Sequence, residues 1–300
     1  MEPESANVSA GPEVDDSIAG LQRGLESTVE TLKTDAKDRT AMARELAKIS
    51  KPGVLYNLKK LETTYNKLKG NLEIDVVHRC GVEPMLRSLA AYVHAAPDRL
   101  RREVGIGMKK ACAEQGLEFR VVSKEEPIEV RIPPLSIVLD FKKSKAVLQY
   151  ARDAVDQCNL HAEDIMKAYE KAVEALNRGF DPDDFFEKCR QAYLRVVRLD
   201  GLNPGDRVEI LRFLPELAFL MQPKKFQENP IAKNYRPYSR ARFAYDIHRL
   251  RQAGGLVRDG LRINLGVATG TTATKKRRVI YMEDPFGAGE YKLTVFFTKS

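Results

Sequence analysis

The spacing of apolar residues changes twice along this chain of 300 residues, and those changes limit the folds open to it. Across residues 17–114, large apolar side chains recur every three or four positions, which is the period of an amphipathic helix. Apolar and polar residues alternate at 117–121 and 128–132, as they do in half-buried strands, and further strands are expected at 136–141 and 146–150. A helical period returns from about 159 to 199. The pattern predicts a mainly α-helical region with a small antiparallel β-meander inserted at about 117–150.

The first helical segment carries a seam with alternating spacings of three and four residues. Its positions are Ile18, Leu21, Leu25, Thr28 and Leu32. Such a seam is typical of coiled coils, and further amphipathic segments follow at about 39–49 and 54–72. An ordinary helical bundle and a coiled coil with a partner both fit this pattern. We therefore predict a homo-oligomer or a protein partner, bound through residues 17–72.

Local signals place the remaining boundaries of the N-terminal two thirds. Residues 1–16 are small, acidic and polar, which predicts a disordered tail ahead of a region spanning 17–200. Two helices are expected at about 83–95 and 97–114. Asp181, followed by Pro182, predicts a helix N-terminus. The Gly- and Pro-containing run at 201–205 is the best linker candidate.

The last third, residues 206–300, predicts short helices followed by a longer helix and three strands. The expected elements are helices at about 206–213, 215–221 and 239–253, a loop at 223–238, strands at 256–263, 279–282 and 291–297, and a hydroxyl-rich loop at 266–274. In this prediction the helix at 239–253 buries an apolar stripe and shows arginines on its other faces.

This order of elements resembles a winged-helix DNA-binding domain. The passage that carries the resemblance is Ile247-x-x-Leu250-x-x-x-Gly254-Gly255-Leu256-Val257-x-x-Asp259-Gly260, which is similar to the end of a recognition helix entering a wing. The resemblance covers residues 206–300 and no part of 1–200. It implies that the helix at 239–253 enters the major groove and that a basic-tipped hairpin contacts the backbone or the minor groove. The loop before that helix and the wing are both long for this class.

Charge is distributed unevenly. The whole chain has a formal charge of +8. Residues 1–50 carry 6 Lys and Arg against 10 Asp and Glu, whereas residues 201–300 carry 18 against 9. This asymmetry predicts that the C-terminal end faces a polyanion. A basic domain that is merely well solvated remains an alternative, because charge alone is not specific to nucleic acid.

The resemblance and the charge together nominate a set of DNA-binding residues. Early residues of a groove-docked helix reach base edges and phosphates, and cations or hydroxyls on a wing bind the backbone. The candidates at the helix are Arg236, Ser239, Arg240, Arg242 and Arg249, and those at the wing are Thr271, Thr272, Lys275, Lys276, Arg277 and Arg278.

Other chemistry has no support in the sequence. The four cysteines, Cys80, Cys112, Cys158 and Cys189, are more than 30 residues apart and form no C-x-x-C pair, so free thiols are expected. The chain lacks a P-loop, a G-x-S-x-G elbow and an H-E-x-x-H motif. We expect no metal, no cofactor and no enzymatic activity.

The absence of a long apolar run argues against a membrane partner and a secretory signal, so a cytoplasmic or nucleoid-associated protein is expected. The sequence thus predicts a DNA-binding protein that uses its N-terminal region for oligomerisation or partner docking. It would be the DNA-engaging subunit of a multi-protein complex or a transcriptional regulator. The alternative is a protein–protein interaction scaffold that binds no nucleic acid. Duplex DNA is the expected ligand, with structured RNA left open.

Overall fold

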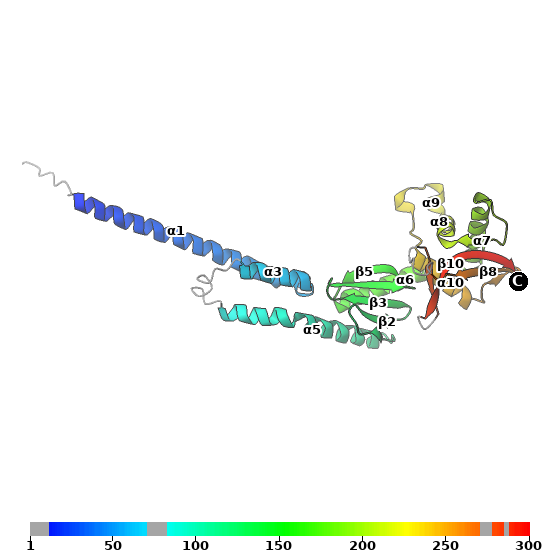
Figure 1. The fold of residues 1–300 in the computed structure, drawn as a ribbon, viewed down its shortest axis with the longest axis horizontal. Helices are drawn as coiled ribbons and strands as arrows, with labels where there is room; N and C mark the ends of the chain where they lie inside the picture. The colour runs from blue at the N-terminus through cyan, green and yellow to red at the C-terminus, as the bar shows by residue number, and fades with distance from the viewer. Residues whose placement is uncertain (1–11, 71–82, 271–277, 285–287) are drawn as a thin grey trace, which may run out of the picture. The chain divides into compact units, whose positions relative to one another are not determined.

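The computed structural model describes residues 12–70, 83–270, 278–284 and 288–300 (Figure 1). The chain divides into two compact units, Met1–Arg99 and Leu100–Ser300, and each is described here by itself. The first is helical, and the second combines helices with antiparallel sheets. Within the described ranges, no helix has the length and apolarity needed to cross a bilayer.

The first unit begins with one long helix, α1 (Pro12–Ile49). The seam and the segment predicted at 39–49 belong to this single helix, and residues 12–16 of the predicted tail are also helical, while residues 1–11 lie outside the described ranges. Helix α1 ends just before Pro52, as predicted, and α2 (Pro52–Leu55) and α3 (Leu58–Gly70) follow. The prediction of separate helices was wrong here, because no helix-breaking residue stands between the two apolar patterns.

The core of this unit is small. It contains Met42, Ile49, Leu61, Leu68 and Ala96, with Leu46, Val54, Leu58, Leu86, Leu89 and Val93 packed against them. These residues come from the C-terminal half of α1, from α2 and α3, and from the start of α5 (Glu83–Glu114). The two helices predicted at 83–95 and 97–114 form this one helix, with Pro97 inside it. A proline removes one intrahelical hydrogen bond, and here the remaining bonds continue the helix.

The second unit opens with a five-stranded antiparallel sheet in sequence order. Its strands are β1 (Arg120–Ser123), β2 (Ile128–Ile132), β3 (Leu135–Asp140), β4 (Lys145–Tyr150) and β5 (Asp153–Asn159). The strand predicted at 128–132 is β2, but its burial does not alternate, because Val130, Arg131 and Ile132 are all buried. Burial does alternate in β3, through Leu135, Ile137 and Leu139. The predicted meander missed β5. Ala151 and Arg152 turn the chain with φ values of 49° and 64°, a conformation that sequence reasoning expects of Gly or Asn.

Helices α6 (Ala162–Asn177) and α7 (Pro182–Leu199) follow this sheet and bury the apolar stripes expected of them. The side chain of Asp181 accepts hydrogen bonds from the backbone N–H groups of Asp183 (3.0 Å) and Asp184 (2.7 Å), so its predicted capping role is confirmed. The α6 N-cap is His161, because Asn159 is still part of β5.

The C-terminal third contains a second antiparallel sheet. Its elements are β6 (Val208–Glu209), α8 (Ile210–Leu220), α9 (Lys224–Glu228), a 3₁₀ turn (Ala232–Asn234), α10 (Arg240–Gln252), β7 (Val257–Arg258), β8 (Leu261–Val267), β9 (Ile280–Glu283) and β10 (Gly289–Lys299). The two helices predicted at 206–213 and 215–221 are one helix, α8. Asp206 does not cap it, because its carboxylate accepts the Asn203 N–H (2.8 Å) in the preceding turn.

The strand pairing differs from the expected wing. In the part of the chain that the structure describes, β8 and β9 each pair with β10 and not with one another, giving the order β6-β10-β8-β7 with β9 also on β10. Asp259 and Gly260 have φ values of 49° and 71° and form the tip of the β7–β8 hairpin, where the prediction had a continuous strand. The winged-helix arrangement is therefore not confirmed.

Helix α10 lies in the core of this unit and touches both sheets, through β4 and β5 of the first and β9 of the second. Its predicted apolar stripe, Phe243, Ala244, Ile247 and Leu250, is buried. Tyr150 of β4 and Tyr245 of α10 meet edge to face, with ring centroids 5.0 Å apart. The helix predicted as a DNA reader is thus an internal packing element.

Candidate nucleic-acid interface

The arginines of α10 are largely enclosed by the protein. Ser239 caps the helix, and its hydroxyl accepts the backbone N–H of Arg242 at 3.2 Å. The side chains of Arg240, Arg242 and Arg249 are only 27%, 15% and 13% exposed. Side chains that insert into a DNA groove must project from the protein surface. The hydrogen-bond and ion-pair partners of these arginines therefore show whether they can contact DNA.

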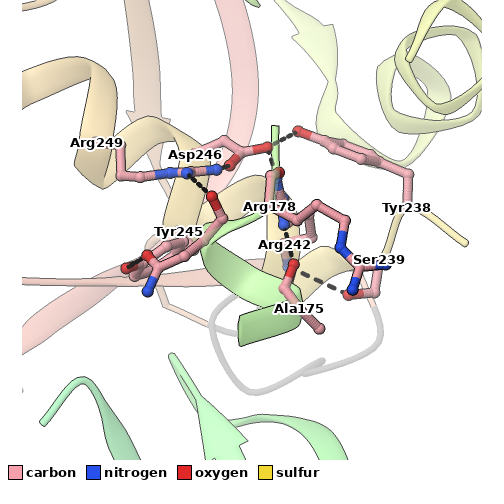
Figure 2. Close-up of polar contacts among 9 residues, drawn as sticks. Ala175, Arg178, Tyr238, Ser239, Arg242, Tyr245, Asp246 and Arg249 are labelled. Atoms are coloured by element: carbon pink, nitrogen blue, oxygen red, sulfur yellow. Dashed lines mark hydrogen bonds and ion pairs between the residues drawn. The ribbon is translucent and has the colours of Figure 1, made fainter. Parts of the chain in front are cut away.

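Arg242 binds the end of α6 (Figure 2). Its guanidinium donates to the backbone carbonyls of Ala175 and Arg178, and its Nε donates to the Asp246 carboxylate at 3.1 Å. Arg249 donates to the carbonyl of Asn177 at 3.2 Å. The last carbonyls of a helix lack intrahelical partners and carry partial negative charge. The two arginines therefore stabilise the C-terminus of α6.

Asp246 is the shared anion of this cluster and is fully buried. It accepts hydrogen bonds from Arg242, from Arg249 and from the hydroxyl of Tyr238, the last at 3.0 Å (Figure 2). Burial and the neighbouring carboxylate raise the pKa of Tyr238 well above its ordinary value. A buried carboxylate needs such partners, because an unpaired charge in the interior is costly.

Arg240 joins more distant parts of the unit. Its Nε lies 3.4 Å from the Asp153 carboxylate of β5, and its guanidinium also donates to the backbone carbonyl of Val279. The sequence nominated Arg240, Arg242 and Arg249 as groove contacts, and the structure gives each of them partners inside the chain.

The other nominated residues fall into two groups. Arg236 and Arg278 are exposed, and Arg278 forms an ion pair with Glu209. Thr271, Thr272, Lys275, Lys276 and Arg277 lie outside the described residues, so their assignment stays a prediction.

An exposed basic surface lies on the segment between α8 and α10. We call residues 222–236, which include α9 and the 3₁₀ turn, the basic lobe (α9 is yellow in Figure 1). Its exposed cations are Lys224, Lys225, Lys233 and Arg236, and its one acidic residue is Glu228. Tyr235 and Ile231 are exposed among them. Cations interleaved with an aromatic side chain are typical of surfaces that bind nucleic-acid backbones and bases.

Buried amides hold the ends of the basic lobe together. Gln222 donates from Nε2 to the carbonyl of Arg236 and accepts the Arg236 N–H at Oε1, both at 2.9 Å. Asn234 donates to the carbonyl of Asn229 at 2.9 Å. Phe226 packs against Tyr235 with ring centroids 5.6 Å apart. The cations are therefore carried on a segment whose backbone is fixed before any ligand arrives.

A surface pocket adjoins the C-terminal end of the basic lobe. It has a volume of about 520 Å³ and is lined by Arg178, Met221, Arg236, Tyr238, Ser239 and Arg242, among others. Arg236 is exposed there, Arg178 is exposed but paired with Glu174 at 2.8 Å, and Arg242 is engaged by α6 and Asp246. The pocket places Arg236 of the lobe beside the N-terminus of α10.

Comparison with protein-family models, with curated proteins and with solved structures finds no match for this chain. Among the residues that the structure describes, no three His, Cys, Asp or Glu side chains are grouped to hold a metal ion. The candidate interface therefore depends on geometry alone. The sequence shows Lys224, Lys225, Lys233 and Arg236 together in one loop, but only Arg236 was nominated as a DNA contact.

Proposed function

We propose that the chain is a DNA-binding subunit of a larger assembly and that the basic lobe contacts the phosphate backbone. The observation that carries this proposal is the lobe itself, a hydrogen-bonded segment that exposes four cations and a tyrosine. The excess of 18 Lys and Arg over 9 Asp and Glu in residues 201–300 supports the same ligand class.

The mode of binding follows from the side chains that the basic lobe exposes. Lysine and arginine neutralise phosphates and release condensed counterions, which gives affinity without reading sequence. The fixed backbone of the lobe reduces the entropy lost on binding. The arginines of α10 are engaged by α6, Asp246, Asp153 and Val279, so the proposal assigns them no base contact. Backbone binding favours a DNA-engaging subunit over a sequence-specific regulator.

An interaction scaffold that binds no nucleic acid is the second candidate. The inward arginines of α10 favour it, because they remove the side chains that the winged-helix resemblance needs at the groove. In that case the basic lobe is a solvated surface.

The test is binding of a fluorescent DNA duplex by the full-length protein across a salt series. In the lobe variant, Lys224, Lys225, Lys233 and Arg236 are all changed to Gln. In the matched control, the exposed residues Lys109, Lys110, Lys142 and Lys167 are changed to Gln, so both variants lose the same charge. If all four lobe cations contact phosphates, the slope of log affinity against log salt becomes shallower by about 3 to 4 in the lobe variant.

Three outcomes are informative. Salt-dependent binding that the lobe variant loses and the control keeps supports the proposal. Equal effects of the two variants contradict the lobe as the contact and indicate diffuse attraction. No binding by the native protein contradicts DNA binding and favours the scaffold. A further variant with Lys275, Lys276 and Arg277 changed to Gln tests the predicted wing, and a structured RNA competitor distinguishes RNA from DNA.

A further inference from the structure

The surface pocket beside the basic lobe has a largely apolar lining. Its volume of about 520 Å³ falls within the range of about 300–1,000 Å³ that is usual for small-ligand sites. The apolar side chains that line it are Ala154, Val155, Ala172, Ala175, Leu176 and Met221. They come from β5, from α6 and from the residue that ends α8. A ligand that fits this pocket therefore presents apolar surface to these side chains.

A β-bulge in β5 places Val155 at the pocket. In the pairing of β4 with β5, Leu148 lies opposite Asp156 and Gln149 lies opposite Ala154, so Val155 is an extra residue with no partner on β4. Bulges occur often at sheet edges and next to active sites, where they redirect a side chain. Val155 is thereby released from the regular alternation of the strand and lines the pocket.

The charged side chains at the pocket are arginines. They are Arg178, Arg236 and Arg242, and none of the described residues that line the pocket is Asp or Glu. Arg178 and Arg242 already have partners in the chain. The guanidinium of Arg236 has no hydrogen bond or ion pair to the described residues, and the backbone of Arg236 is held by Gln222. A guanidinium placed in this way can bind an oxyanion through two parallel hydrogen bonds.

Ser239 supplies a second donor at the same pocket. Its Oγ accepts the backbone N–H of Arg242 at 3.2 Å (Figure 2), and within the described part of the chain its hydroxyl proton has no acceptor. Guanidinium and hydroxyl groups are donors that protein–DNA complexes use on phosphate oxygens. The polar side of the pocket therefore matches a phosphate.

We infer that the pocket receives one unpaired nucleotide of a bound DNA strand. The inference rests on the proposed function, because Arg236 belongs both to the basic lobe and to the pocket. A phosphate held by Arg236 and Ser239 leaves the attached sugar and base beside the apolar lining. A paired base must be extracted from the duplex stack at a cost in free energy, whereas an unpaired base enters at little cost. The expected ligand is therefore a duplex with a single-stranded end.

The test measures the affinity of the full-length protein for three fluorescent DNAs by anisotropy. The first is a blunt duplex, and the second is the same duplex with a short single-stranded overhang. The third has an overhang of equal length made of abasic nucleotides, which keeps every phosphate and lacks only the bases. We expect the natural overhang to bind about fivefold more tightly, or better, than the abasic overhang, because one base contact contributes at least that much.

A pocket variant locates this preference. Ala154→Leu and Ala175→Leu fill the pocket from two exposed positions and leave every cation in place. The matched control, Ala91→Leu and Ala113→Leu, makes the same changes at exposed positions of α5. The pocket variant is expected to bind the two overhangs equally and to keep the native affinity for the blunt duplex. The control is expected to behave as the native protein does, and circular dichroism checks that both variants keep their fold.

Three outcomes would overturn the inference. They are equal affinity of the native protein for the natural and the abasic overhang, a preference that the pocket variant keeps, and a preference that the control also loses. The first outcome needs no variant, so it is decisive even if the pocket variant fails to fold.

The same measurements separate this inference from the proposed function. If the blunt duplex is bound and the lobe variant loses that binding, the proposed function stands whether or not the pocket prefers an unpaired nucleotide. If the native protein binds none of the three DNAs, both proposals are contradicted. If it binds only the natural overhang and the pocket variant loses that binding, the inference stands and the contact of the lobe with duplex DNA is contradicted.

Discussion

Arg131 and Glu283 form a bidentate ion pair across 152 positions of sequence, with both N–O distances at 3.1 Å. The two side chains are only 6% and 5% exposed. Arg131 lies on β2 and Glu283 on β9, so the pair joins the two sheets of the Leu100–Ser300 unit. Arg131 also donates to the Ser136 hydroxyl at 3.1 Å. A charged side chain buried this deeply is tolerated only when its oppositely charged partner is also present.

Changing Glu283→Gln should therefore destabilise the fold strongly. It leaves the Arg131 charge buried without its anion, and the expected loss in the free energy of unfolding is about 3–5 kcal/mol. Urea titration measures the loss. The matched control is Lys171→Gln, which removes an exposed pair with Asp156 and should cost at most about 1 kcal/mol. Similar losses in the two variants would show that the buried pair does not hold the sheets together.

Changing Arg242→Gln tests the role of α10. The variant loses donors to the carbonyls of Ala175 and Arg178 and one partner of Asp246. Unsatisfied buried groups of this kind cost about 1–3 kcal/mol each. We expect a clear loss of thermal stability and little change in the salt dependence of DNA binding. If the variant keeps the native stability but loses DNA affinity, Arg242 contacts DNA and its proposed structural role is contradicted.

His248 should make stability depend on pH. Burial, followed by the charge of Arg251, lowers its pKa from the ordinary value of 6.5 in the folded state. The unfolded chain then binds the proton more tightly, so this contribution to stability is present above pH 6.5 and is lost as the pH falls through the lowered pKa. Urea titrations between pH 7.5 and 5 should show a steeper loss for the native chain than for His248→Gln. Parallel curves would contradict the assignment.

Cys158 should be a slow nucleophile. Burial, with smaller effects of Asp164 and Asp156, raises its pKa from 9.0 to about 11. At pH 8 its thiolate fraction is then about a hundredfold below that of an ordinary thiol, and alkylation slows with it. Labelling with iodoacetamide over a pH range, followed by peptide mass spectrometry, resolves this cysteine from the others. The protein unfolded in urea supplies the reference rate. A labelling rate for Cys158 that levels off near pH 9 would contradict the raised pKa.

Local patterns in the sequence predicted much of the secondary structure. The stripe of α10 and the cap at Asp181 are set by neighbours within a few residues, and the structure confirms them. The pairing of β10 with both β8 and β9 depends on contacts between distant segments, which periodicity does not encode. The expected wing hairpin was wrong for that reason.

Local sequence patterns also could not predict that the α10 arginines point into the protein. The carbonyls that Arg242 binds lie 64 and 67 residues earlier in the chain, at the end of α6. An arginine at a helix C-terminus and an arginine at a phosphate look the same in sequence, because backbone carbonyl oxygens with partial negative charge and phosphate oxygens both accept hydrogen bonds from guanidinium. The basic lobe was missed as a unit because its closure depends on the buried side chains of Gln222 and Asn234.

The most direct test of the central claim is a photo-crosslink from the basic lobe to DNA. A benzoylphenylalanine in place of Tyr235 would sit among the lobe cations, and one in place of Gln115, which is exposed near the end of α5, serves as the control. The account predicts a crosslink to duplex DNA from position 235 that disappears as salt rises, with little from position 115. No crosslink from position 235, or equal crosslinking from the two positions, would contradict the lobe as the nucleic-acid contact.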